Sequence, residues 1–369
     1  MKIIEIIPQL NQGGAERFVI DLCNELTKHH DVTLIILHSI EKDNQFYSEI
    51  SPDIQIISMN KKKGGDYRLF YRLYKLIKKI SPDIVHTHLR GIVYALLSYL
   101  LLPNKPKFIH TVHNDAPKEA GGKISKWCRF FAFKTQRVHP VTISEESQKS
   151  FSNFYHLTST LIYNGRLPYN EKTDITNIQN ELSNLKGRKN AKIITNVARI
   201  QEQKNQITLA KAIINLNEQG YPFDLFIIGN KTDKKIAKQI ENLKSPFIHI
   251  LGNRDNPRDY MRASDAFCLS SIYEGMPITL IECFSVGAIP ICTPVGGVVN
   301  MIQHQQNGLL TEGTSQQNLE KALIQFYQLD NKSYKNMQIL SKQSFQYYTL
   351  ETCSQRYINL MHSLLNKNK

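Results

Sequence analysis

Short runs of apolar residues alternate along this chain with longer stretches in which apolar residues recur every three or four positions. In the first half, the short runs predict strands at 2–7, 32–38, 54–58, 83–86, 107–112 and 138–143. The intervening stretches 15–28, 66–80 and 91–102 have the apolar spacing of helices. Strands that alternate with helices form a parallel sheet with helices on both faces. We therefore expect a Rossmann-like domain here.

The alternation is interrupted once and then repeats. After Asn164 and Gly165 comes a polar stretch, 169–190, rich in Asn, Lys and Glu, which predicts a linker. Strands are then expected at 192–197, 223–228, 247–250, 266–269 and 289–292, and helices at 205–219, 233–243, 278–287 and 316–328. The expected parts are an N-terminal domain over 1–166, a linker over 167–190, a second Rossmann-like domain over 191–342 and a helical tail over 343–369.

Two glutamates of the second repeat, Glu274 and Glu282, stand on either side of a Gly-Met-Pro corner. Residues from Ile278 onward predict a helix, because proline is tolerated where a helix begins. Backbone N–H groups at a helix start bind anions, and carboxylates bind hydroxyl groups. Such glutamates are usually solvated, but apolar neighbours argue against an open surface here. The segment therefore suits a sugar nucleotide, which has hydroxylated groups on both sides of a diphosphate.

Two further motifs lie where strands are expected to end. Arg199 and Lys204 follow the strand 192–197 and could converge on a diphosphate, although such a pair alone is usually surface charge. Gly13 and Gly14 follow the first strand and open a helix expected to begin near Ala15, where a plain tight turn is an equal alternative. In sheets of this kind, ligands bind beyond the carboxyl ends of the strands.

In this order, the motifs resemble those of the large fourth family of retaining glycosyltransferases. The resemblance covers residues from about 3 to 350 and implies the GT-B fold, an α/β architecture. In that fold two Rossmann-like domains face each other across a cleft, and a C-terminal helix crosses back to the N-terminal domain. Two positions depart from the common pattern: Asn300 stands where an acidic residue often occurs, and Ala198 replaces a glycine. These departures leave the donor chemistry intact and the identity of the sugar open.

The resemblance also implies a role for each motif residue. Arg199 and Lys204 would bind the donor diphosphate, Glu274 the sugar hydroxyls and Glu282 the ribose. His113 would contact the donor sugar near the reacting carbon. The remaining donor contacts would come from Gly13, Gly14, Leu251, Asn253, Gly275, Met276, Ile278 and Thr279. The catalytic residues would be His113, Glu274, Arg199 and Lys204. Attack on the same face as the departing group would give retention, and the donor nucleotide would be UDP, with GDP as the alternative.

Four histidines, at positions 86, 88, 110 and 113, cluster at two strand ends and raise the question of a metal. No cysteine or carboxylate nearby completes a usual ligand set, and the pair at 86 and 88 is expected to face opposite sides of its strand. The sequence therefore predicts no metal site and no cofactor besides the nucleotide sugar.

Composition and the longest apolar stretch indicate the cellular compartment of the protein. Its 369 residues are 41% hydrophobic and 21% charged, as in soluble globular proteins. Six cysteines without regular spacing predict reduced thiols. The N-terminus lacks the pattern of a signal peptide, and the longest apolar stretch, 91–102, is too short to span a bilayer. We therefore expect a cytoplasmic protein that attaches peripherally to the inner face of the cell membrane.

Net charge is +14 and is concentrated in two segments. Residues 61–79 hold eight basic residues against one acid, and 118–137 hold six against one, interleaved with apolar and aromatic residues. Amphipathic basic helices favour an anionic membrane surface. With the implied activity, this predicts transfer of a hexose or N-acetylhexosamine to a lipid-linked or soluble saccharide acceptor in capsule or O-antigen synthesis.

Two alternatives belong to other functional classes. A non-hydrolysing UDP-sugar epimerase would share the fold, but it needs several catalytic carboxylates and histidines that the motifs do not supply. A basic nucleic-acid-binding protein would explain the charge. It would leave Glu274 and Glu282 unexplained, and the sequence has no nucleic-acid-binding signature. No nucleic-acid partner is therefore expected.

Overall fold

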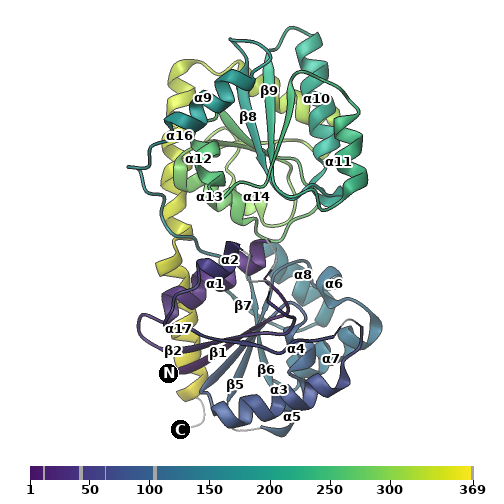
Figure 1. Ribbon diagram of the computed structural model, residues 1–369, viewed down its shortest axis with the longest axis vertical. Helices are drawn as coiled ribbons and strands as arrows, with labels where there is room; N and C mark the ends of the chain where they lie inside the picture. The colour runs from purple at the N-terminus through teal and green to yellow at the C-terminus, as the bar shows by residue number, and fades with distance from the viewer. Residues whose placement is uncertain (11–12, 41–44, 63, 103–105, 367–369) are drawn as a thin grey trace. The chain divides into compact units, whose positions relative to one another are not determined.

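The computed structural model describes residues 1–10, 13–40, 45–62, 64–102 and 106–366. The chain divides into two compact units, residues 1–167 with 349–369 and residues 168–348. Each unit is a parallel sheet covered by helices on both faces (Figure 1). With these two parallel-sheet domains, the protein has the expected α/β architecture.

The sheet of the N-terminal unit has the strand order β3-β2-β1-β4-β5-β6-β7. Its strands are β1 (Lys2–Ile7), β2 (Asp31–Ile36), β3 (Gln55–Ser58), β4 (Ile84–His88), β5 (Lys107–Val112), β6 (Val138–Thr142) and β7 (Thr160–Leu161). Its helices are α1 (Gly14–Leu26), α2 (Gln45–Ser48), α3 (Tyr67–Ile80), α4 (Gly91–Tyr94), α5 (Leu96–Leu101), α6 (Ala116–Ala120), α7 (Lys123–Lys134), α8 (Glu145–Tyr155) and α17 (Leu350–Asn366). The strand order reverses between β1 and β4, which are neighbours.

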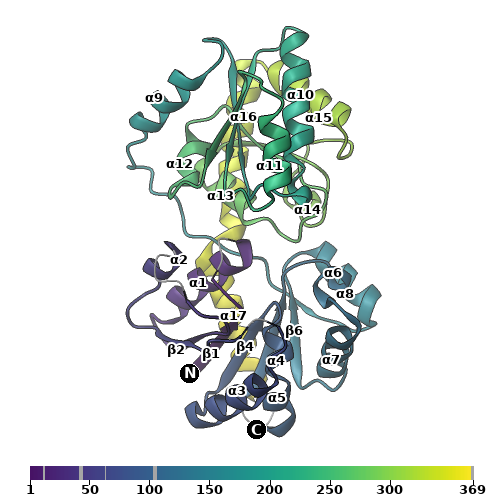
Figure 2. The same ribbon diagram turned by 45° about the vertical axis from the view of Figure 1, so that its right-hand side comes forward.

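Residue alternation along β1 assigns the two faces of this sheet. Ile4 and Ile6 belong to a buried cluster with apolar residues of α3, α5, α7 and α8. Ile3, Glu5 and Ile7 point to the opposite face, since successive strand residues alternate. Helices α1 and α17 contact each other and this second face, where Figures 1 and 2 show them side by side.

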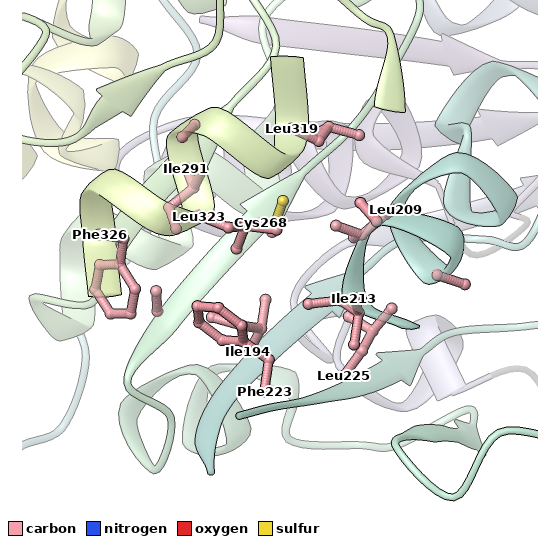
Figure 3. Packing of buried hydrophobic residues seen from close by; sticks show 14 of the residues in the cluster. Ile194, Leu209, Ile213, Phe223, Leu225, Cys268, Ile291, Leu319, Leu323 and Phe326 are labelled. Atoms are coloured by element: carbon pink, nitrogen blue, oxygen red, sulfur yellow. The ribbon is translucent and has the colours of Figure 1, made fainter. Parts of the chain in front are cut away.

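The C-terminal unit repeats the arrangement with the strand order β10-β9-β8-β11-β12-β13. Its strands are β8 (Lys192–Val197), β9 (Phe223–Ile228), β10 (Ile248–Gly252), β11 (Ala266–Leu269), β12 (Ile289–Cys292) and β13 (Leu309–Leu310). Its helices are α9 (Thr176–Leu185), η1 (Glu202–Lys204), α10 (Gln206–Glu218), α11 (Lys234–Glu241), α12 (Pro257–Arg262), α13 (Ile278–Val286), α14 (Val298–Met301), α15 (Gln316–Tyr327), α16 (Asn331–Ser344) and η2 (Phe345–Tyr348). Figure 3 shows α10 and α15 packing apolar side chains onto the sheet.

The polar segments after the first repeat differ from expectation. The predicted linker spans 167–190, and all of it except Leu167 lies within the second unit. This part includes α9, a largely polar helix in which Ile178 and Leu182 are buried. Helix α16 was not predicted, and the tail helix α17 begins at Leu350, later than the expected 343. The stretch 91–102 forms two short helices, α4 and α5, in place of one.

The chain re-enters the N-terminal unit where Gly165 meets Thr349. A Cβ atom on Gly165 would lie 2.6 Å from the carbonyl oxygen of Thr349, so only glycine allows this approach. The Leu350 N–H donates to the Arg166 carbonyl at 2.9 Å, which fixes the start of α17. The last helix therefore completes the fold of the first unit.

All six cysteines are unpaired, and five of them are buried. Burial raises the pKa of the Cys268 thiol to about 12, so the group stays protonated at neutral pH. Among the described residues, no helix combines the length and apolar character needed to cross a membrane.

Candidate active site

Several of the predicted donor residues of the C-terminal unit lie near the point where its strand order reverses, between β8 and β11. Arg199 follows β8, and Lys204 ends the short helix η1 just beyond it. Glu274 lies on the loop that follows β11. In doubly wound sheets this reversal opens a crevice at the carboxyl ends of the strands, where ligands bind.

Lys204 and Glu274 are in direct contact. The Lys204 Nζ lies 2.6 Å from the Glu274 Oε1, and both side chains are largely buried. The Ser271 hydroxyl donates to the same oxygen at 2.5 Å. One oxygen of Glu274 is therefore held by a cation and a hydroxyl, which fixes the direction of the carboxylate.

The loop that carries Glu274 is fixed by its neighbours. Gly296 has a φ of +51°, and a Cβ atom there would lie 1.8 Å from the Glu274 carbonyl oxygen. The Gly297 N–H donates to the Gly275 carbonyl at 2.7 Å. On the other side, the Gln203 side-chain amide donates to the Tyr273 carbonyl at 2.8 Å. The carboxylate is thus preorganised by backbone contacts.

Helix α13 begins at Ile278, as the sequence predicts, with Pro277 directly before it. Its first amides, including those of Ile278 and Thr279, belong to the turn that has no intrahelical acceptors. Gly275 and Met276 lie in the loop just before this turn. Glu282 is the fifth residue of the helix and is buried, with 6% of its surface exposed. The helix start could bind an anion, and the two carboxylates beside it could accept hydrogen bonds from hydroxyl groups.

The other two donor residues predicted in this unit lie at the edge of the sheet. Leu251 belongs to β10, and Asn253 follows Gly252 at the end of that strand. Strand β9 separates β10 from β8. These two residues are therefore at a strand end, as expected, but on the edge strand.

The remaining predicted residues belong to the N-terminal unit. Gly13 caps helix α1 and Gly14 is its first residue, one position before the predicted start. His113 follows β5 and has 6% of its surface exposed. Its backbone N–H donates to the Glu119 Oε2 at 2.6 Å, and Glu119 in turn pairs with the buried Arg129. The loop that carries His113 is therefore fixed by Glu119 of α6, which Arg129 of α7 holds in place.

The expectation for the histidines at 86 and 88 is wrong. Residues two apart on a strand share a face, and the rings of His86 and His88 lie 4.1 Å apart, centroid to centroid. Glu5, from the neighbouring strand β1, contacts both rings and completes a group whose atoms could hold a metal ion. In the structure these atoms form hydrogen bonds with one another, from the two rings to Glu5. The absence of a metal remains a prediction.

Two family models match successive parts of the chain. Glycosyltransferase Family 4 matches residues 12–166, and Glycosyl transferases group 1 matches residues 177–343. The chain belongs to the GT-B glycosyltransferases of group 1.

Several known proteins are similar to this glycosyltransferase over most of its length. A UDP-Gal:α-D-GlcNAc-diphosphoundecaprenol α-1,3-galactosyltransferase from Escherichia coli is 29% identical over 67% of both chains. A capsular polysaccharide biosynthesis glycosyltransferase from Staphylococcus aureus is 26% identical over 80% of this chain and 82% of its own. The crystal structure of HepE from Anabaena in complex with UDP-glucose matches with a TM-score of 0.82, at 18% identity, over 98% of this chain and 100% of that one.

Sequence reasoning missed several residues of this glycosyltransferase that support the predicted ones. Ser271 and Gln203 donate hydrogen bonds to residues of the Glu274 loop. His88 contacts the His113 ring, and Glu5 contacts His88. One signal was available: Glu5 is the only acidic residue in the otherwise aliphatic interior of the first strand, which marks a buried carboxylate that needs partners.

Proposed function

We propose that this glycosyltransferase moves a hexose or N-acetylhexosamine from a UDP-sugar to a lipid-linked saccharide, with retention of configuration and without a metal. The observation that carries the proposal is the Lys204–Glu274 pair at the strand reversal of the C-terminal unit, beside the start of α13. Two of the similar proteins favour UDP: the Escherichia coli galactosyltransferase is named for the donor UDP-Gal, and the HepE crystal structure contains UDP-glucose.

Each side chain of this pair has a distinct part in the chemistry. Lys204, with Arg199, would stabilise the negative charge that grows on the departing diphosphate. Glu274 would accept hydrogen bonds from the donor sugar through the oxygen that Lys204 does not hold. Since charged hydrogen bonds are among the strong ones, the pair would also align the sugar relative to its leaving group.

Retention would follow from attack on the same face as the departing UDP. A donor phosphate oxygen would take the proton of the acceptor hydroxyl, and no enzyme carboxylate is assigned as a nucleophile. The contribution of the protein would be orientation of the donor and electrostatic stabilisation.

The proposal of a lipid-linked acceptor rests on the names of two relatives and on one exposed surface of the N-terminal unit. The name of the Escherichia coli relative includes a diphosphoundecaprenol-linked sugar, and that of the Staphylococcus aureus relative includes capsular polysaccharide. On α7, Ile124, Trp127 and Phe131 expose 81%, 67% and 37% of their surface at helical spacing. Exposed aromatic residues flanked by lysines are typical of helices that lie on an anionic membrane.

Helix α3 contributes less to this surface than its sequence implies. Its apolar stripe packs into the core, because Leu69, Leu73 and Ile77 are completely buried. Tyr67 and Tyr71 remain exposed beside its lysines. Helix α5 contacts both α3 and α7, so these two helices lie on the same face of the N-terminal sheet. We propose that this face rests on an anionic membrane, where the lipid-linked acceptor is found.

A donor and acceptor assay tests the proposed function. Purified protein is incubated with UDP- or GDP-linked hexoses and N-acetylhexosamines and a diphosphoundecaprenol-linked saccharide, with and without EDTA. We expect UDP release only with a UDP-sugar and acceptor, insensitivity to EDTA, and an α-linked product from an α-linked donor. Arg199→Ala and Lys204→Ala should each lower turnover at least about tenfold, because a charged hydrogen bond is lost.

The same assay separates the alternatives. Conversion of the donor sugar to its epimer without acceptor would establish the epimerase instead. Near-normal turnover in both variants would overturn the assignment of the diphosphate site. Steeply salt-dependent retention of a nucleic acid, with no sugar transfer, would favour the basic nucleic-acid-binding protein.

A further inference from the structure

A buried polar network lies behind His113 in the N-terminal unit. Its members come from three neighbouring strands, β1, β4 and β5, and from the last helix, α17. Glu5, His86, His88, Thr111 and Tyr357 are all fully buried. Buried polar groups of this kind persist only when they are hydrogen-bonded, so each proton in the network can be assigned from its partners.

The network has two arms that meet at Glu5. In one arm, the His88 Nε2 lies 2.8 Å from the Glu5 Oε2, and the His88 Nδ1 lies 2.9 Å from the His113 Nε2. In the other arm, the His86 Nδ1 lies 3.1 Å from the Glu5 Oε1. The second arm continues through Thr111 to the hydroxyl of Tyr357 by two contacts of 2.8 Å.

Ionised Glu5 can only accept hydrogen bonds, and this sets the direction of the first arm. Burial raises the pKa of Glu5, but the interactions with His86, and then the hydrogen bond from His88, outweigh burial and hold that pKa below its ordinary value. Burial, and then the neighbouring His86, lower the pKa of His88 well below its ordinary value. His88 is therefore neutral and has a single ring proton, which Glu5 draws to Nε2.

The proton on His88 Nε2 determines the next ring. The Nδ1 of His88 is left with a lone pair, so its contact with His113 requires that the His113 Nε2 carries a proton. Burial lowers the pKa of His113 to about 4, so this ring is neutral as well. Its other nitrogen, Nδ1, then has a lone pair and can accept a hydrogen bond.

We propose that Glu5, acting through His88, fixes the tautomer of His113 and so presents the His113 Nδ1 as an acceptor for a hydroxyl group of the sugar substrate. Glu5 and His88 are positioning residues in this arrangement. The Glu119 carboxylate holds the backbone of His113, and Glu5 and His88 hold its ring. The proposal rests on the proposed function only for the role of His113; the tautomer itself does not depend on the substrate.

Long-range proton–nitrogen NMR on protein with 15N-labelled histidine reads the tautomer directly, without substrate. The signals of His113 are identified by their loss in His113→Asn. We expect the wild-type ring of His113 to be protonated at Nε2 alone. Glu5→Met removes the carboxylate without shortening the side chain, and His113 should then populate both tautomers. Tyr357→Phe is the matched control, because it alters only the other arm and should leave His113 unchanged.

Turnover gives a second readout. Glu5→Met should lower kcat about tenfold, the scale of one lost hydrogen bond, with unchanged affinity for UDP, whereas Tyr357→Phe should retain wild-type kcat. The proposal is overturned if wild-type His113 carries its proton on Nδ1, or if Glu5→Met leaves a single tautomer. It is also overturned if purified protein contains zinc held by Glu5, His86 and His88. If no UDP-sugar is turned over but the tautomer is as expected, the proposed function fails and the network stands.

Discussion

At the scale of single residues, the two glutamates beside α13 differ in their surroundings. One carboxylate oxygen of Glu274 accepts hydrogen bonds from Lys204 and Ser271. Glu282, in contrast, is a buried residue of α13 itself. Glu282→Gln should weaken binding of UDP itself about tenfold, because a charged acceptor for the ribose hydroxyls is lost. Glu274→Gln should impair sugar transfer and leave UDP affinity almost unchanged, because it releases Lys204 for the diphosphate. Calorimetric titration with UDP, together with initial rates, checks both; equal losses of UDP affinity would contradict the assignment.

Some of these residues could be predicted from local sequence and some could not. Glu274, Glu282 and the start of α13 are determined by a short motif whose proline and glycine limit the backbone. The contact between Glu5 and His86 joins residues 81 positions apart. It exists only because β1 and β4 are neighbours at the strand reversal, and the spacing of residues does not encode strand order.

At the scale of elements, α7 makes the membrane proposal testable. Changing Lys123, Lys126 and Lys134 to Gln should weaken binding to phosphatidylserine vesicles more than tenfold at low salt, since each basic residue near an anionic surface contributes about 1 kcal/mol. Vesicle sedimentation measures this, with neutral phosphatidylcholine vesicles as the reference. Lys234, Lys235 and Lys238, exposed on α11, provide a control with the same change in charge. Equal recovery on neutral and anionic vesicles, or an equal loss in the control, would leave only a soluble acceptor.

Elements were predictable where their apolar pattern was dense. The central strands and α3, α10 and α15 were expected from repeated apolar positions, and each buries them in a core. Helices α9 and α16 were missed because each buries only two residues among many polar ones. Such a sparse pattern resembles that of a loop.

At the scale of the whole molecule, the separate cores of the two units predict separate responses to mutation. Met361, on α17, is completely buried. Met361→Ala should destabilise the N-terminal unit by about 2–5 kcal/mol, the usual cost of such a cavity. Hydrogen exchange with peptide resolution should show faster exchange in β1, β4 and β5 and no change in β8 and β9. His362→Ala, at an exposed neighbour, should change neither; equal acceleration in both units would contradict the division.

The return of the chain through α17 also has a consequence during synthesis. The N-terminal unit needs residues 349–366, yet its other part ends at Leu167. At about 5–20 residues per second, the ribosome takes roughly 10–40 s to make the intervening segment. During that time the face of the sheet that α1 and α17 cover lacks the second of these helices. The C-terminal unit is continuous, so this polypeptide can complete its second domain before its first.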